Sequence, residues 1–169
     1  MNDTYYEKIV KRKTSSVALL LRFIVVFITV IVMYLGTLAL GLSGIIGGIL
    51  FIWIDTVIFK NTDVEYEYLL IGGELSVDAI YGKKKRKKCR RLDMRKIEVF
   101  APINSDKIKE CKGNRKITVA DYSSGTPEGT KYAFVIPEEE GRIYEIIFEP
   151  SEEMVNSIKF VAPGKVFMY

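Results

Sequence analysis

"VEYEYLLIGGELSVDAIY", residues 64–81, is the stretch of sequence that decides the fold of the C-terminal part of the chain. Apolar side chains occupy every second position on both sides of the Gly72-Gly73 pair. A period of two is typical of half-buried β-strands, and a glycine pair between two such runs is typical of a tight turn. The stretch therefore predicts an antiparallel β-hairpin.

The residues after this hairpin extend the pattern to a small mainly-β domain. The basic residues that follow it are expected to form a turn and a third strand up to about Leu92. Alternating stretches predict four more strands, at residues 95–101, 115–122, 131–137 and 142–150. One short helical turn is expected within residues 104–113. We therefore expect about seven antiparallel strands, arranged as a bent sheet or partly open barrel.

The last segment has the period of a helix. Met154, Ile158 and Val161 stand at i, i+4 and i+7, and Ser151 precedes them as a candidate N-cap. This pattern predicts a C-terminal helix that caps the β domain.

An apolar block precedes the β domain and predicts a membrane α-hairpin. Residues 17–59 contain only two charged side chains, Arg22 and Asp55. A single helix of that length would measure about 65 Å, roughly twice the 30 Å of a hydrocarbon core, whereas two spans fit. We expect spans at residues 17–35 and 41–59. A cleaved signal peptide is disfavoured, because its apolar region is only about 7–15 residues long.

The domain organisation and orientation follow from the positions of the charges. We expect a basic N-terminal tail at residues 1–16, a transmembrane hairpin at 17–60 and a soluble β domain at 61–169. Basic residues precede the first span and the turn between the spans is uncharged, which places both termini in the cytoplasm. The expected location is the cell (inner) membrane, with the chain passing through it twice.

Arg22 and Asp55 are expected to lie near the cytoplasmic interface, because each is close to the cytoplasmic end of its span. There they would pair or extend toward the headgroups, which is a structural role. A transport or proton-relay role is the alternative, since charges inside membranes are often functional. Gly44 and Gly48 form a G-x-x-x-G pattern, which favours close helix packing within the hairpin over a dimer interface.

The basic run is the candidate binding site. Ten basic residues and one acidic residue fall within residues 83–96, so the rest of the chain is acidic although its net charge is +4. Near an anionic leaflet such a run favours lipid contact, and the alternative is a solvated hairpin that only fixes topology. Nucleic acid is disfavoured, because no aromatic residue is interleaved with the basic ones. The candidate lipid-binding residues are Lys83, Lys84, Lys85, Arg86, Lys87, Lys88, Arg90 and Arg91.

Catalysis and cofactor binding are not indicated by the composition. The chain has no histidine, the commonest general base and metal ligand, and its two cysteines form no C-x-x-C pair. We therefore expect no catalytic residue, no metal site and no cofactor.

Several blocks of the sequence resemble known families. The order of strands and closing helix is similar to that of bacterial pleckstrin-homology (PH)-like domains. The chain also resembles an uncharacterised bacterial family of small two-span membrane proteins. The resemblance lies in residues 61–87 and in the blocks "VKRK", "LDMRKIEVFAPI", "DYSSG" and "FEPSEEM", which begin at residues 10, 92, 121 and 148. The resemblance implies the topology and supplies no site residue.

Together these features predict a non-enzymatic integral membrane protein whose PH-like domain contacts anionic phospholipids through the basic hairpin. The alternative is a protein-interaction or self-assembly module of a membrane complex, with a protein partner or homo-oligomer. A small transporter or channel subunit is a third hypothesis, and it is disfavoured by the small number of polar residues in the spans.

Overall fold

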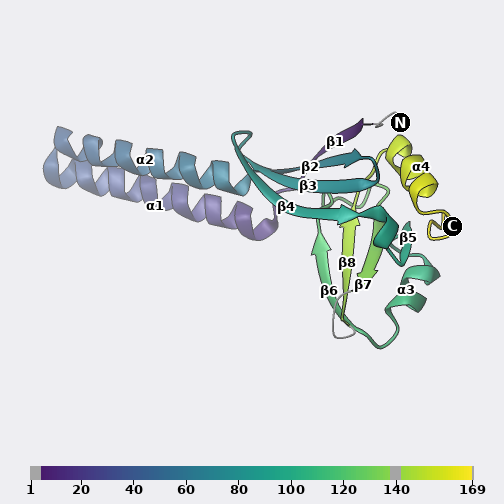
Figure 1. Cartoon of the computed structure of the whole chain (residues 1–169). Coiled ribbons are helices and arrows are strands. Elements are labelled where there is room, and N and C mark those ends of the chain that lie inside the picture. The colour runs from purple at the N-terminus through teal and green to yellow at the C-terminus, as the bar shows by residue number, and fades with distance from the viewer. Residues whose placement is uncertain (1–4, 138–141, 169) are drawn as a thin grey trace. The chain divides into compact units, whose positions relative to one another are not determined.

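The computed structural model describes residues 5–137 and 142–168, which form two compact units (Figure 1). The helical unit consists of Thr14–Val64 together with Ile80–Lys85. The β unit contains the remaining described residues. The helical unit therefore includes one short segment of the basic run.

Two antiparallel helices make up most of the helical unit, α1 (Ser16–Leu40) and α2 (Leu42–Thr62). Both are long and apolar enough to cross a membrane. The connection is the single residue Gly41, with φ +61°, so it is shorter than the turn expected from the sequence. A Cβ on Gly44 would collide with the backbone of Gly36, and one on Gly48 would collide with Met33. The G-x-x-x-G pattern thus packs inside the hairpin.

The first sheet of the β unit has the order β1-β2-β3-β4. Its strands are β1 (Tyr5–Lys11), β2 (Val64–Ile71), β3 (Glu74–Tyr81) and β4 (Lys85–Asp93). The alternating apolar residues of β2 and β3 are buried except at the outer ends, Val64 and Tyr81, and Tyr68, Leu75 and Val77 are fully inaccessible. Strand β1 pairs antiparallel with β2, with Lys11 opposite Glu65. The two helices are therefore inserted in the sequence between two neighbouring strands.

The second sheet has the order β5-β7-β8-β6. Its strands are β5 (Val99–Pro102), β6 (Lys116–Asp121), β7 (Tyr132–Pro137) and β8 (Arg142–Phe148). Three short elements complete the unit, the 3-10 helix η1 (Met94–Lys96) and the helices α3 (Asp106–Lys112) and α4 (Glu152–Val161). The Ser151 hydroxyl accepts a hydrogen bond from the Met154 N–H, so the predicted N-cap is present.

The core lies between the two sheets and is centred on an aromatic cluster. The ring of Phe148 contacts Tyr68 from the first sheet at 5.5 Å between centroids, and Phe134 from the second sheet at 5.4 Å. Helix α3 packs on the second sheet through Ile108, and α4 buries Met154 and Ile158. The aromatic cluster thus joins the two sheets, whereas Ile108 belongs to a separate cluster formed by α3 and the second sheet.

Two features of the predicted fold are wrong. The described residues contain eight strands in two sheets rather than about seven, because the N-terminal residues expected as a tail contain β1. The strands are also not all antiparallel, since β6 runs parallel to β8 (Figure 1). The C-terminal helix and the mainly-β character are as predicted.

Candidate membrane-contact site

The tip of the β3–β4 hairpin lies at the C-terminal end of α2, within the helical unit. The N–H of Gly82 donates a 2.8 Å hydrogen bond to the carbonyl of Asp63. A Cβ on Gly82 would lie 2.9 Å from Cβ of Lys60, so only glycine fits this approach. These contacts hold the lysines of the tip beside the residue at which the second helix ends.

The tip itself is a tight turn with an uncommon residue. Gly82 and Lys83 have φ of +54° and +58°, and the N–H of Lys84 donates to the carbonyl of Tyr81 at 3.1 Å. Positive φ at both central positions defines a type I′ turn, where the second position is usually glycine. Lysine therefore occupies a position that favours glycine.

The eight candidate lipid-binding residues fall into two groups. Five of them are exposed lysines that form no ion pair or side-chain hydrogen bond within residues 5–137 and 142–168. We call these the free lysines: Lys83, Lys84, Lys85, Lys87 and Lys88. Arg86 instead pairs with the buried Glu67 at 2.7 Å, and the guanidinium of Arg90 lies 4.3 Å from the ring centroid of Tyr144. Arg91 is exposed.

Arg22 and Asp55 make different contacts. Arg22 donates from Nε to the Thr62 hydroxyl at 2.9 Å and from Nη2 to the Phe59 carbonyl at 3.2 Å. Its guanidinium thereby caps the C-terminal end of α2. Asp55 is buried, and its Oδ1 has no hydrogen-bond partner among the described residues.

A polar network in the β unit joins four of the sequence blocks that carried the resemblance. Arg12 donates to the Tyr66 hydroxyl and the Asp121 carbonyl, and the Lys13 N–H donates to the Ser124 carbonyl at 2.7 Å. Ser124 then donates from both N–H and Oγ to Oε1 of the buried Glu149. The network therefore includes residues just before α1, Arg12 and Lys13, and a residue shortly after α2, Tyr66.

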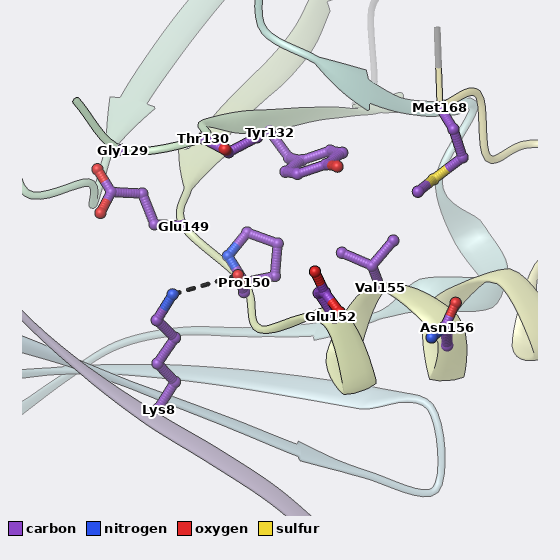
Figure 2. A pocket seen from close by; sticks show the side chains of 10 residues that line it. All are labelled: Lys8, Gly129, Thr130, Tyr132, Glu149, Pro150, Glu152, Val155, Asn156 and Met168. Atoms are coloured by element: carbon purple, nitrogen blue, oxygen red, sulfur yellow. Dashed lines mark hydrogen bonds between the residues drawn. The ribbon is translucent and has the colours of Figure 1, made fainter. Parts of the chain in front are cut away.

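A cavity of about 460 Å³ lies next to this network, between β1, the loop before β7 and the start of α4 (Figure 2). Tyr132, Pro150 and Val155 form its apolar wall. Lys8 donates to the Pro150 carbonyl at 3.2 Å, and Glu149 lies at one end beside Gly129. The cavity thus combines an apolar wall with charges of both signs.

Comparison with known proteins gives one family. The family described as a bacterial PH-like domain (DUF6106), a domain of unknown function, matches residues 2–168. The chain belongs to this family. No curated protein and no solved structure matches it significantly. PH-like domains are generally non-catalytic, and this family together with two helices able to cross a membrane fits a membrane-associated protein.

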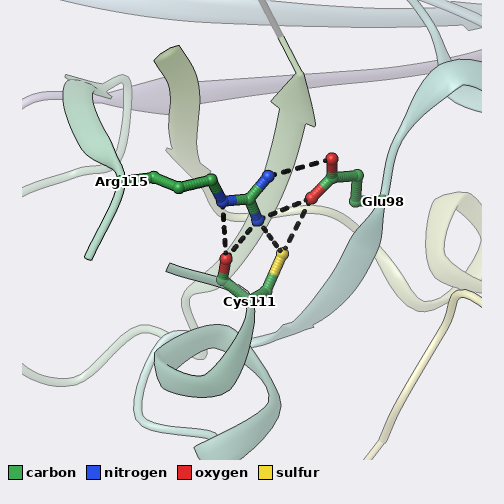
Figure 3. Close-up of polar contacts among 3 residues, drawn as sticks. All are labelled: Glu98, Cys111 and Arg115. Carbon is green, nitrogen blue, oxygen red and sulfur yellow. Dashed lines mark hydrogen bonds and ion pairs between the residues drawn. The ribbon is translucent and has the colours of Figure 1, made fainter. Parts of the chain in front are cut away.

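One further cluster in the PH-like domain was not predicted from the sequence. Arg115 forms a two-pronged ion pair with Glu98, at 3.1 and 2.8 Å, and also donates to the Cys111 carbonyl (Figure 3). The Cys111 thiol donates to Glu98 at 3.2 Å. Burial and then Glu98 raise the pKa of the Cys111 thiol, whereas Arg115 lowers the pKa of Glu98. The cluster thus ties the end of α3 to the strands around it through a protonated thiol.

Proposed function

We propose that this PH-like protein is anchored in the cell (inner) membrane by α1 and α2, and that its cytoplasmic domain contacts the anionic leaflet of the same membrane through the free lysines. In this proposal residues 17–60 form the membrane hairpin, residues 61–169 lie in the cytoplasm, and no catalytic step is involved. The observation that carries the proposal is the packing of Gly82 against Lys60, at the end of α2.

The β1–β2 pairing supports a topology with both flanks on one side. Tyr5–Lys11 precedes the helices and Val64–Ile71 follows them, yet the two strands are hydrogen-bonded neighbours. A sheet cannot form across a bilayer, so a hairpin that spans the membrane must return to the side on which it began. The basic residues before α1, Lys8, Lys11, Arg12 and Lys13, favour the cytoplasmic side.

The position of the tip supports lipid contact in the same membrane. Helix α2 ends at Thr62, and Lys60 is the basic residue of its last turn. Lys83, Lys84 and Lys85 belong to the same compact unit as this end of the helix. Each lysine near an anionic leaflet contributes about 1 kcal/mol, and tethering makes the contact intramolecular.

The test uses the full chain in nanodiscs, because a fragment beginning at residue 61 lacks β1. Amide hydrogen exchange of residues 80–91 is compared in discs of pure phosphatidylcholine and in discs that also contain phosphatidylglycerol. We expect slower exchange with the anionic lipid, because bound headgroups restrict opening of the hairpin. The difference disappears in high salt, which screens exposed charges.

Two charge-matched variants make the test specific. Replacing Lys83, Lys84 and Lys85 with glutamine is expected to remove the effect of phosphatidylglycerol. Replacing Lys109, Lys116 and Lys159 with glutamine is expected to keep the effect, because these exposed lysines lie outside residues 83–96. An unchanged lipid effect in the first variant, or an equal loss in both, would refute the leaflet contact.

The second candidate function is a protein-interaction module, and the cavity beside α4 favours it. Its apolar wall and mixed charges suit a peptide segment better than a lipid headgroup. Cross-linking in native membranes, followed by purification of the full chain, distinguishes the two functions. Glu152 also lines the cavity. A cross-linked partner that is lost in Glu152→Lys and kept in the triple-glutamine variant supports the interaction module.

A further inference from the structure

The apolar hairpin contains two buried polar side chains, one on each helix, that have an oxygen without a hydrogen-bond partner. Asp55 on α2 is 8% exposed and Thr29 on α1 is 4% exposed. Asp55 Oδ1 and Thr29 Oγ1 are the buried side-chain oxygens that lack a hydrogen-bond partner within the described ranges. Leaving such a group unsatisfied costs about 1–3 kcal/mol, and more when it is charged, so an occupant that binds both is favoured.

The helix register places the two groups about one turn apart. Arg22 contacts Phe59, Met33 contacts Gly48 and Gly36 contacts Gly44. In this antiparallel register Asp55 is level with Val26, three residues from Thr29. Three residues correspond to about 4.5 Å along a helix axis. This offset suits a bridging species bound to both oxygens, and neither oxygen makes a direct hydrogen bond to the other.

The charge of the occupant follows from the other charges of the hairpin. Arg22 is the only basic residue within residues 17–59, and its donors go to Thr62 and Phe59. Asp55 therefore has no basic partner within the described hairpin. A bound proton would neutralise Asp55 alone, whereas a bound cation also satisfies Thr29 Oγ1. A monovalent ion neutralises one carboxylate, whereas a divalent ion would leave a buried positive charge.

We propose that Asp55 and Thr29 bind one alkali-metal cation between α1 and α2. Carboxylate and hydroxyl oxygens are suitable ligands for such hard cations, and water supplies the remaining ligands. The site is independent of the proposed leaflet contact, since it uses none of the free lysines. It gives the hairpin an ion-dependent stability in addition to its role as an anchor.

The test measures thermal unfolding of the full chain in a neutral detergent. LiCl, NaCl and KCl are each compared with N-methylglucamine chloride at equal ionic strength. We expect one alkali cation to raise Tm by about 5 °C in a saturable way, as a ligand of the folded state does. Equilibrium dialysis with the radioactive form of that cation is expected to give one bound ion per chain.

Matched variants identify the ligands. Asp55→Asn is expected to abolish the cation response and the bound ion, and Thr29→Val to raise the half-saturating concentration at least tenfold. Thr37→Val is the control, because Thr37 is exposed and bonds to the carbonyl of Met33 in its own helix. The proposal is overturned if Tm is equal in all four salts, if Asp55→Asn keeps the response, or if Tm responds to acidification and not to cations. If Asp55→Asn does not fold, the comparison of Thr29→Val with Thr37→Val decides.

Discussion

Lys83 adopts a backbone conformation that is unfavourable for lysine. Its φ of +58° lies in the left-handed region, which costs a residue with a Cβ about 1–2 kcal/mol. Gly82, the other central residue of the turn, avoids this cost. Strained residues persist where the surrounding structure fixes them and often lie at functional sites. The strain at the tip therefore agrees with a requirement for the lysine charge.

The first prediction concerns this residue. Lys83→Gly is expected to raise the free energy of unfolding by about 0.5–1 kcal/mol, because glycine relieves the strain, and to weaken the effect of phosphatidylglycerol. Lys84→Gly, next to it, is expected to lower the free energy of unfolding by a similar amount, because Lys84 has an ordinary backbone conformation. Chemical unfolding of both variants in detergent measures the difference. A loss of stability in Lys83→Gly would contradict the argument from strain.

The free lysines show how far sequence reasoning reaches at a site. The density of basic residues identified the run, since composition is visible without a fold. The partners of Arg86 and Arg90 were not predictable, because Glu67 lies on another strand and Tyr144 lies in the other sheet. The same holds for the pair Glu98 and Arg115, which only the path of the chain through α3 brings together.

At the level of elements, β1 is the strand that sequence reasoning missed. In "YYEKIVK" the apolar residues occur in adjacent pairs rather than in alternation, and only Val10 is buried. Its partner strand begins more than fifty residues later, so no local signal indicates the pairing. Strands β2 and β3 were predicted because their alternation and turn are local.

Strand β5 was predicted too early for an identifiable reason. Residues 95–101 were expected to form the strand, but the Asp93 carboxylate accepts a hydrogen bond from the Arg95 N–H and starts η1. The strand begins only at Val99. A side chain that binds the backbone two residues on competes with strand formation, and period alone does not reveal it.

The second prediction tests the contribution of β1. Val10→Ser is expected to lower the free energy of unfolding by about 2 kcal/mol, because Val10 is 7% exposed and a buried hydroxyl replaces two methyl groups. Ile9→Ser, at 52% exposure, is expected to change it by less than about 0.5 kcal/mol. Urea unfolding of the full chain in detergent compares the two. Equal effects would mean that β1 does not pack on the domain in solution.

At the scale of the whole molecule, the helical hairpin is an insertion between two strands of the PH-like domain. The sheet needs residues from both sides of the insertion, since Lys11 and Glu65 are paired. The core between the sheets contains no residue of α1 or α2 among its fully buried large side chains. The two helices and the core of the domain therefore use separate residues of the described chain.

The third prediction follows from this separation. A chain in which residues 14–62 are replaced by a short Gly/Ser linker is expected to be soluble and folded, with well-dispersed amide signals in NMR spectra. Residues 61–169 alone are expected to be less stable by at least about 2 kcal/mol, because they lose Val10 and expose the edge of β2. If the fragment is as stable as the linked chain, β1 contributes nothing to the domain.

The insertion of the helices between β1 and β2 also sets the order of events during synthesis. Strand β1 leaves the ribosome first and must wait until both helices and β2 have been made. At about 5–20 residues per second, the intervening residues take roughly 3–10 s to synthesise. During that time β1 lacks the strand with which it pairs. In a chain anchored as proposed, β1 would reach β2 only after the hairpin had returned to the starting side. Completion of the sheet would then report correct membrane insertion, and a chain inserted with a single span would retain an unpaired strand for quality-control proteases to recognise.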